Sequence, residues 1–386
     1  MHIKDLTKKI SRGTTEIIDI EDLEKRLQKS PKGLRIKAGF DPTAPDIHLG
    51  HVVLLRKLRQ FQDLGHQVYF LIGDFTAQIG DPTGKDRLRP KMDARQVAQN
   101  AKTYKKQVFK VLDPKRTKIV FNSAWLGKLS AHEVLGLSQY STVAQMLARA
   151  DFKERFEQQK EISLLEFFYP LLQGYDSVYL KADVELGGSD QKFNLLMGRQ
   201  LQEANGQRPQ VVIMTPLLEG TDGVQKMSKS LNNYIGINEP PSEMFGKLMS
   251  VNDGLMYRYF ELLTDFDVAE MKALHPKEAK LTLAQTIVEQ FYTKKDALSA
   301  REVFLNTFSR REVPADIQEY QLFKNPDESL VDVLVKTKLA DSRNEVRRLL
   351  KQGAIVHNGQ KIQAENWPLA EGVLKIGKRR FLRLIK

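Results

Sequence analysis

Short apolar runs alternate with longer segments of helical periodicity along the first two thirds of the chain. We expect buried strands at residues 34–39, 68–72, 118–122, 183–186 and 211–214. In the segments between them, such as residues 52–64, apolar side chains recur every three or four positions, which predicts helices. Strand, helix and strand at this spacing form crossover units. The pattern therefore predicts an α/β fold whose parallel sheet carries helices on its faces.

The pattern changes near residue 239. Beyond it, only helical periodicity is found as far as about residue 326. Two short helices and several short strands then follow, which predicts a small α/β unit at the C-terminal end. We therefore expect three domains, at residues 1–236, 237–326 and 331–386.

Composition excludes several classes of protein. The 386 residues include no cysteine, so disulfides and thiolate zinc sites are excluded. No apolar run approaches the roughly 18 residues that a membrane span needs. The opening residues, MHIKDLTKKI, lack the apolar stretch of a secretion signal. We expect a cytoplasmic protein without a membrane partner.

Positive charge is concentrated at the C-terminal end. Residues 331–386 hold 13 Lys and Arg against 5 Asp and Glu, which accounts for +8 of the net charge of +12. Arg343, Arg347 and Arg348 lie along one side of the predicted helix 342–352. Such a side suits RNA phosphates, although a basic helix that meets only water has the same pattern. We therefore expect a polyanionic partner to bind here.

The segment KAGFDPTAPDIHLGH, residues 37–51, joins the first predicted strand to the first long helix. His48 and His51 are three positions apart, so they share a face at the helix start, and Gly50 lets a flat ligand approach the backbone. Free N–H groups, the helix dipole and two imidazoles together favour an anionic, planar ligand. A proline-rich loop whose histidines only cap the helix is the alternative.

The loop KMSKS, residues 226–230, offers a second cationic group. Lys226 and Lys229 are three positions apart in a polar segment flanked by glycines, which is typical of a mobile clamp for phosphates. Taken alone, the same pattern more often marks a solvated surface loop.

Polar residues also gather where other predicted strands and helices meet. Tyr169, Gln173 and Asp176 share one helical face among apolar neighbours, where buried polar groups require partners. The loop 73–90 and the turn GGSDQ, residues 187–191, each follow a predicted strand, where open α/β sheets bind ligands. The alternatives are a solvated helix edge and a plain helix cap.

The pair HLGH and KMSKS, about 175 residues apart, resembles the signature of class I aminoacyl-tRNA synthetases, in which the two motifs flank ATP across a Rossmann-like sheet. With IGDPTGK, YPLLQGYD and GGSDQ between them, the order of motifs resembles the bacterial tyrosyl-tRNA synthetase family. Residues 331–386 resemble an S4-type RNA-binding domain. The resemblance extends from about residue 34 to residue 386.

The resemblance implies a tyrosine–tRNA ligase. Such an enzyme activates L-tyrosine with ATP, releasing pyrophosphate, and transfers the tyrosyl group from the adenylate to the 3′-terminal adenosine of tRNA(Tyr), releasing AMP. It further implies a Rossmann-like catalytic domain, a helical domain on the anticodon side, and a homodimer. Mg²⁺ would accompany ATP as part of the substrate, and no protein-bound metal or prosthetic group is expected.

The family's functional residues carry over onto three sets of positions. The set for tyrosine is Lys37, Asp81, Tyr169, Gln173, Asp176 and Gln191. The set for ATP is Gly39, Asp41, His48, His51, Gly188, Asp190, Lys226, Lys229 and Ser230. Catalytic stabilisation of the phosphates would come from Thr43, His48, His51, Lys85, Arg89, Lys226 and Lys229.

One position departs from the family pattern. Many members carry a tyrosine where this chain has Lys37, and that tyrosine shares the substrate hydroxyl with the carboxylate matching Asp176. We expect the Lys37 ammonium to lie near Asp176 and to keep this carboxylate ionised despite burial.

Two rival functions stay open at this stage. A synthetase of the tryptophanyl type would keep both ATP motifs, but it would not be expected to present the polar face of Tyr169, Gln173 and Asp176. A non-catalytic RNA-binding paralogue would have lost the ATP residues, and both ATP motifs are intact in this sequence.

Overall fold

The computed structural model describes residues 3–83, 92–309, 317–322, 328–377 and 380–385. The chain divides into two compact units, Met1–Ala300 and Arg301–Lys386. Lys85 and Arg89 fall outside the described residues.

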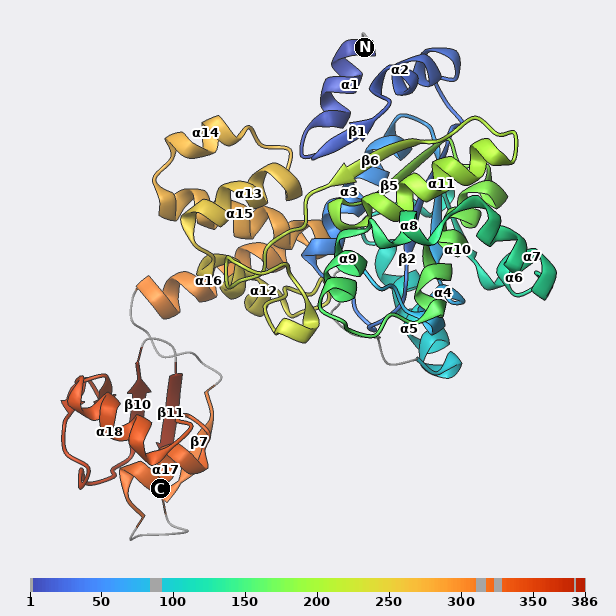
Figure 1. The fold of residues 1–386 in the computed structure, drawn as a ribbon. Helices are drawn as coiled ribbons and strands as arrows, with labels where there is room; N and C mark the ends of the chain where they lie inside the picture. The colour runs from blue at the N-terminus through green and yellow to red at the C-terminus, as the bar shows by residue number, and fades with distance from the viewer. Residues whose placement is uncertain (1–2, 84–91, 310–316, 323–327, 378–379, 386) are drawn as a thin grey trace. The chain divides into compact units, whose positions relative to one another are not determined.

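A six-stranded sheet forms the centre of the first unit, in the order β1-β6-β5-β2-β3-β4 (Figure 1). Five of its strands are parallel to their neighbours, and they are the five that the apolar runs predict. The strands are β1 (Glu16–Ile18), β2 (Arg35–Phe40), β3 (Gln67–Ile72), β4 (Thr117–Phe121), β5 (Val184–Gly188) and β6 (Val211–Thr215). The α/β class is confirmed.

Strand β1 was not expected from the sequence. It pairs with β6 in the antiparallel direction, so the sheet is mixed rather than wholly parallel. Its three residues, EII, lie within a charged segment and are too few to show the periodicity of a strand. The strand forms because its backbone pairs with the apolar β6, a contact that the local sequence does not reveal.

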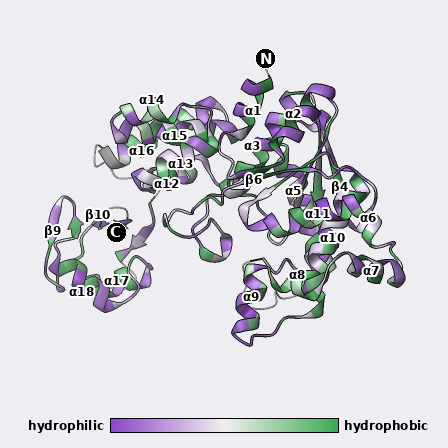
Figure 2. Ribbon diagram, turned by 45° about the horizontal axis from the view of Figure 1, so that its top comes forward, coloured by the Kyte–Doolittle hydropathy of each residue, from purple (hydrophilic) through white to green (hydrophobic). Residues whose placement is uncertain are grey.

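Helices cover both faces of this sheet (Figure 1). Helix α3 packs on β2, β3 and β5, whereas α10 and α11 pack on each other and on the other face. The helices are α1 (Ile3–Ser11), α2 (Ile20–Lys29), α3 (Leu49–Asp63), α4 (Thr76–Ile79), α5 (Ala94–Val108), α6 (Ser123–Leu126), α7 (Ala131–Leu137), α8 (Val143–Leu147), α9 (Ala150–Glu157), α10 (Leu164–Leu180) and α11 (Lys192–Ala204). Several carry both hydrophobic and hydrophilic residues along their length (Figure 2), as expected of helices that bury one side.

Helix α10 illustrates how the local sequence fixes an element that carries site residues. Its first turn is closed by a capping box, in which the Ser163 hydroxyl accepts from the Leu165 amide and the Glu166 carboxylate accepts from the Ser163 amide. Its last turn ends at Lys181, which adopts a left-handed conformation. These two ends fix where α10 begins and stops, and thereby the position along the helix of Tyr169, Gln173 and Asp176.

The first unit continues into a helical region after β6. It contains α12 (Pro241–Ser250), α13 (Asp253–Leu263), α14 (Val268–Ala273), α15 (Pro276–Phe291) and α16 (Lys294–Ser309), the last of which crosses the boundary between the units. Helix α13 packs against α3, so the helical region rests on the α/β part. The proposed three-domain division at 236 and 326 stays a prediction.

The second unit is built on a five-stranded sheet in the order β7-β11-β10-β8-β9. Its elements are β7 (Glu319–Gln321), α17 (Leu330–Lys336), α18 (Arg343–Lys351), β8 (Ile355–His357), β9 (Gln360–Ile362), β10 (Gly372–Ile376) and β11 (Arg380–Ile385). Apolar side chains of both helices and of the strands form its core. The segment 319–321, expected to belong to the helical region, instead pairs with β11 as an edge strand.

Candidate active site

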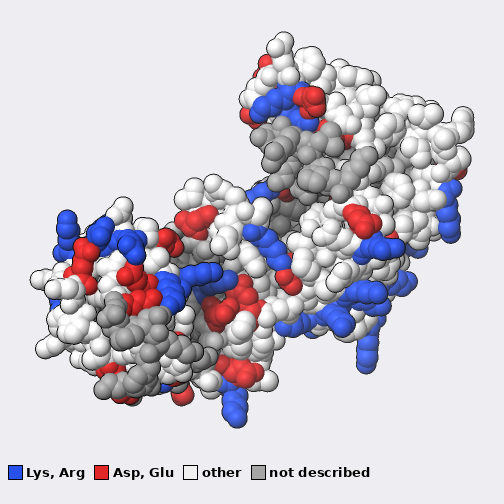
Figure 3. All heavy atoms as spheres, turned by 90° about the horizontal axis from the view of Figure 1, so that it is seen from below, with Lys and Arg blue, Asp and Glu red and all other residues white. Residues whose placement is uncertain are grey.

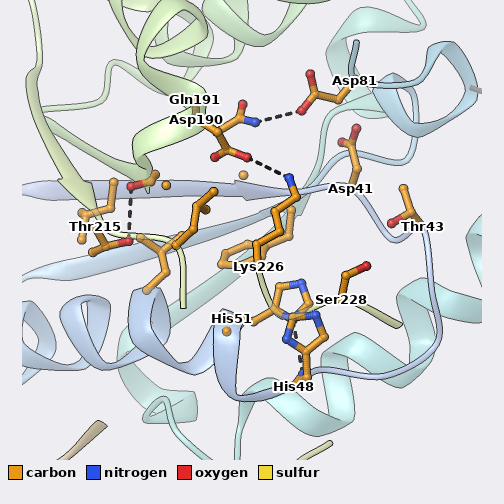
Figure 4. Close-up of a pocket in the computed structure, with 18 of the residues that line it drawn as sticks. Asp41, Thr43, His48, His51, Asp81, Asp190, Gln191, Thr215, Lys226 and Ser228 are labelled. Carbon is orange, nitrogen blue, oxygen red and sulfur yellow. Dashed lines mark hydrogen bonds and ion pairs between the residues drawn. The ribbon is translucent and has the colours of Figure 1, made fainter. Parts of the chain in front are cut away.

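A cavity of about 720 Å³ opens at the carboxyl ends of the parallel strands (Figure 4). It brings together every described residue of the predicted tyrosine, ATP and catalytic sets. These are Lys37, Gly39, Asp41, Thr43, His48, His51, Asp81, Tyr169, Gln173, Asp176, Gly188, Asp190, Gln191, Lys226, Lys229 and Ser230. Arg343, Arg347 and Arg348 lie in the second unit, all three on α18.

The two predicted ATP motifs are held together by the backbone. Gly236, shortly after the KMSKS loop, forms an isolated antiparallel bridge with His48. On either side of it, the Leu49 amide donates to the Ile235 carbonyl at 2.9 Å, and the Ile237 amide donates to the Ile47 carbonyl at 3.0 Å. The loop is thus anchored at the start of α3, although about 175 residues of sequence separate the motifs.

The two histidines are neutral at pH 7. Burial and the nearby charge of Lys229 lower the pKa of His51 to about 4, and burial together with His51 and Lys229 lowers that of His48 to about 2. His51 Nδ1 accepts from the His48 amide at 3.2 Å, so its proton is assigned to Nε2. A Cβ at Gly50 would lie 3.0 Å from the His48 ring, so glycine leaves that imidazole its place.

Each lysine of the KMSKS loop is paired with a carboxylate at the rim of the cavity. Lys226 Nζ lies 3.5 Å from Asp190 (Figure 4), and Lys229 forms an ion pair with Asp46. Both ammonium groups therefore face the same space as the histidines. Burial raises the pKa of Asp190, and the Lys226 charge opposes that rise.

Asp176 is a buried carboxylate in the lining of the cavity. Its side chain is 1% exposed, and it accepts from the Trp125 indole at 2.8 Å and from the Asn122 amide at 3.3 Å. Burial raises the pKa of this carboxyl to about 7, although the Lys37 ammonium and the two hydrogen bonds lower it. The expectation that Asp176 is held fully ionised is therefore too strong, because burial outweighs the nearby positive charge.

A chain of hydrogen bonds lines the wall between Asp176 and the strand ends. The Tyr169 hydroxyl donates to Asp41 Oδ2 at 2.8 Å, and Thr76 donates to Asp41 Oδ1 at 2.8 Å. The Asn122 amide bridges Thr76 and Asp176, at 3.1 and 3.3 Å. These contacts fix the side chains before any ligand arrives.

A second carboxylate, Asp81, lies on the other side of the cavity from Thr215, the last residue of β6 (Figure 4). It accepts from the Gln191 amide at 2.8 Å and from the Thr83 hydroxyl at 2.6 Å. Arg149 adds a longer ion pair with Asp81 at 3.9 Å. A carboxylate and an amide oriented in this way suit an ammonium group.

Lys37 faces the cavity, but its direct partner is not Asp176. Its ammonium forms an ion pair with Glu185 at 2.8 Å, and both side chains are almost fully buried. The influence of Lys37 on Asp176 is electrostatic. The expected influence of Lys37 on Asp176 is therefore present, but the ion-pair partner of Lys37 is Glu185 on the neighbouring strand, which was not expected from the sequence.

Sequence reasoning missed several residues of this cavity. Glu185 and Thr76 line it, and Asn122 and Trp125 hold Asp176 from behind. The sequence does contain a signal for Glu185. It is an acid within the apolar strand β5, Lys37 is a lysine within the apolar strand β2, and two opposite charges in buried strands of one sheet indicate an ion pair. Trp125 and Asn122 lie on or next to the four-residue helix α6, whose position depends on tertiary packing.

Family models match almost the whole chain. Residues 29–309 match the model described as tRNA synthetases class I (W and Y), and residues 311–381 match the tyrosine–tRNA ligase SYY-like C-terminal domain. Among curated proteins, the tyrosine–tRNA ligase of Desulfotalea psychrophila is 52% identical, covering 97% of this chain and 96% of its own length. That of Oleidesulfovibrio alaskensis is 53% identical over the full length of both chains.

Solved structures agree in fold. A tyrosyl-tRNA synthetase from Archaeoglobus fulgidus, complexed with L-tyrosine, has a TM-score of 0.64 at 25% identity, covering 78% of this chain and 99% of its own. A C-terminally truncated mitochondrial tyrosyl-tRNA synthetase from Aspergillus nidulans has a TM-score of 0.65 at 22% identity, covering 79% of this chain and 99% of its own.

The chain therefore belongs to the class I tRNA synthetases of the tryptophan and tyrosine type. Within that class, its full-length relatives are tyrosine–tRNA ligases, and that is the activity of this chain.

Proposed function

We propose that the cavity binds L-tyrosine at the Asp176 end and ATP between the histidines and the KMSKS loop. In this arrangement the tyrosine carboxylate attacks the α-phosphate of ATP, and pyrophosphate leaves toward Lys226 and Lys229. No nucleophile of the protein is needed, because the substrate supplies its own. The residues act by positioning and by stabilising the charge that develops on the phosphates.

The tyrosine end is assigned from the chemistry of its groups. An ionised Asp176 accepts the phenol proton as a charge-assisted bond, while Asp81 and Gln191 hold the α-ammonium. Tyr169 and Gln173 complete this wall. Phenylalanine would leave the buried Asp176 with only the Trp125 and Asn122 donors and without the one that the phenol supplies. This cost is the basis of selection, a rule for which tyrosyl-tRNA synthetases are themselves the usual illustration.

The ATP end is assigned from the strand ends and the start of α3. Gly39, Gly188 and Gly50 leave backbone open to a flat nucleotide, and Asp190 suits the ribose hydroxyls. His48 and His51 donate as neutral imidazoles, and Thr43 lies on the same rim. Lys85 and Arg89, outside the described residues, are proposed for the pyrophosphate on the sequence resemblance alone.

Mg²⁺ fits this proposal as the partner of the ATP phosphates rather than as a resident metal. Asp41 and Asp190 line the cavity, and carboxylate oxygens are ligands that Mg²⁺ accepts. When bound with ATP, the ion would neutralise phosphate charge. The described residues hold no cluster of three or more metal-ligating side chains.

The convergence of both lysines, both histidines and Asp176 on one cavity carries the proposal. The test is exchange of labelled pyrophosphate into ATP, measured without tRNA for a panel of amino acids. We expect exchange with tyrosine alone. Equal exchange with tryptophan or phenylalanine would refute the assignment of the phenol end, and no exchange with any amino acid would refute the assignment of the ATP end.

For the second unit we propose RNA binding of the S4 type, in which the basic side of α18 contacts tRNA(Tyr). We also propose a homodimer and a cytoplasmic location, where tRNA is charged. In the part of the chain that is described, no helix is both long and apolar enough to cross a bilayer.

A further inference from the structure

A buried ion pair lies at the end of the cavity that we assign to the phenol ring. Lys37 and Glu185 are register partners in the adjacent parallel strands β2 and β5. Their charged atoms are 2.8 Å apart, and neither side chain is more than 2% exposed. Removing two charges from water is costly, and such a pair stabilises a fold only weakly. Its presence beside a substrate pocket therefore suggests a role in recognition.

The Lys37 ammonium is fully used by the protein. An ammonium has three protons to donate, and three acceptors surround this one. They are Glu185 Oε1 at 2.8 Å, the Ser177 hydroxyl at 2.8 Å and the Gln173 carbonyl at 3.2 Å. No proton of Lys37 is left over for the hydroxyl of a substrate.

The other side of the pair is equally well held. Glu185 Oε2 accepts from the Ser177 hydroxyl at 2.9 Å and from the Gln210 amide. A Cβ at position 198 would lie 2.6 Å from the Gln210 amide nitrogen and 3.2 Å from Glu185 Oε2, so a larger residue there would push on both groups. The pair is thus held by groups of α10 and of the residue before β6, with Gly198 of α11 packed against them.

The pair still acts on Asp176 through its charges. Lys37 from β2 favours the ionised carboxylate and Glu185 from β5 opposes it, while α6 and its N-cap residue contribute only the neutral donors Trp125 and Asn122. From its own helix, α10, the neutral Tyr169 and Gln173 share the cavity with Asp176. Burial raises the pKa of Asp176 to about 7, so near neutral pH modest changes in local charge alter its ionisation.

We propose that Lys37 and Glu185 form a positioning unit for tyrosine recognition, which sets the charge on Asp176 without touching the substrate. Lys37 thus makes no contact of its own to the hydroxyl. It acts by an electrostatic influence on the one carboxylate that reads the hydroxyl. The inference rests on the proposed assignment of Asp176 to the phenol.

The test uses the full chain with three substitutions: Lys37→Met, Glu185→Gln and the double variant. Tyrosine-dependent pyrophosphate exchange is measured from pH 5.5 to 9. The quantity recorded is the midpoint, which is the pH at which kcat/KM for tyrosine reaches half of its maximum. We expect Lys37→Met to raise that midpoint by about one pH unit, because a favourable charge is lost. Glu185→Gln should lower it, and the double variant should fall between the two. The ratio of kcat/KM for tyrosine over phenylalanine above the midpoint should be unchanged in all three.

Lys57→Met is the matched control. Lys57 is also a buried lysine, 5% exposed, and it donates to the Ile10 carbonyl at 2.8 Å away from the cavity. Its loss should lower thermal stability and leave the midpoint in place. If Lys37→Met does not fold, Glu185→Gln still tests the inference, because it keeps the shape of the carboxyl and one of its two accepting oxygens while removing the charge.

Two results would overturn the inference. Midpoints that stay fixed in every variant would make the pair purely structural. A collapse of the tyrosine over phenylalanine ratio in Lys37→Met, with Glu185→Gln normal, would mean that Lys37 contacts the hydroxyl itself. By contrast, a midpoint that survives Asp176→Asn would refute the assignment of Asp176 in the proposed function.

Discussion

Lys226 Nζ lies 3.5 Å from the carboxylate of Asp190, so a lysine proposed for the pyrophosphate is paired, before ATP binds, with the residue proposed for the ribose. Lys229 is paired with Asp46 in the same way. The KMSKS loop therefore enters the reaction from a state in which its charges are already balanced. ATP must replace these carboxylates, which couples nucleotide binding to release of the lysines.

We predict that Lys226→Ala and Lys229→Ala slow adenylate formation far more than they weaken tyrosine binding. The lysines meet the phosphates as charge develops there, and removal of one preorganised donor costs on the order of 3 kcal/mol in the transition state. Single-turnover rates and equilibrium binding of tyrosine separate the two effects. Loss of tyrosine affinity at an unchanged rate would make the loop structural.

Asp46→Asn is the complementary change. It frees Lys229 from its ion pair without removing the ammonium. We expect the single-turnover rate to be kept and the KM for ATP to fall, because ATP no longer has to displace a carboxylate. A loss of rate as large as that of Lys229→Ala would show instead that Asp46 takes part in the chemistry.

The histidines should contribute no titration of the chemical step. His48 and His51 have pKa values of about 2 and about 4, so both stay neutral from pH 5.5 to 8. At saturating tyrosine and ATP, we expect a flat single-turnover rate over this range. His51→Asn should keep most of the rate, since an amide still donates, whereas His51→Ala should lose on the order of 3 kcal/mol of stabilisation. A step near pH 6.5 that disappears in either variant would contradict a neutral imidazole.

Tyrosine use should depend on pH through Asp176. The pKa of this carboxyl is raised to about 7, so the proton is bound below pH 7 and lost above it. The ionised form accepts the phenol proton, and kcat/KM for tyrosine should therefore rise as pH increases through about 7. For folding the sign is opposite: stability falls as pH rises from the unfolded value near 4 toward 7, because the folded state holds the proton. Asp176→Asn should abolish the kinetic midpoint, and its persistence would exclude Asp176.

The sequence was informative where local pattern and tertiary structure agree. The five apolar runs became the five parallel strands, and spacing alone placed Tyr169, Gln173 and Asp176 on one face of α10. Prediction failed where long-range pairing decides, as in β1 and β7, which are three residues long and depend on β6 and β11.

The buried pair of Lys37 and Glu185 shows the same limit within the site. Each residue lies in an apolar strand, but only the register between β2 and β5 brings the two together. The register cannot be read from the sequence, so the sequence alone indicated Asp176, and not Glu185, as the acid near Lys37. The same holds for the Trp125 and Asn122 donors, because the short helix α6 has no sequence pattern of its own.

Arg348 offers the sharpest test of RNA binding by the second unit. Arg343 pairs with Asp332 at 2.5 Å and Arg347 with Glu365 at 3.1 Å, whereas exposed Arg348 has no ion pair with a described residue. Figure 3 shows acidic groups beside basic ones in this unit. The three arginines are therefore not equivalent, because two of them must leave a carboxylate before they bind a phosphate.

We predict that Arg348→Ala raises the KM for tRNA(Tyr) in the charging reaction more than Arg347→Ala does, and that neither changes tyrosine-dependent pyrophosphate exchange. Each phosphate contact that is lost should reduce the slope of log KM against log salt by about one. Arg347→Ala frees Glu365, so Glu365→Gln is the matched control, and it should lower the KM by removing a competitor for Arg347. Charging that is equally efficient in all variants at moderate salt would exclude this side of α18 as the RNA contact.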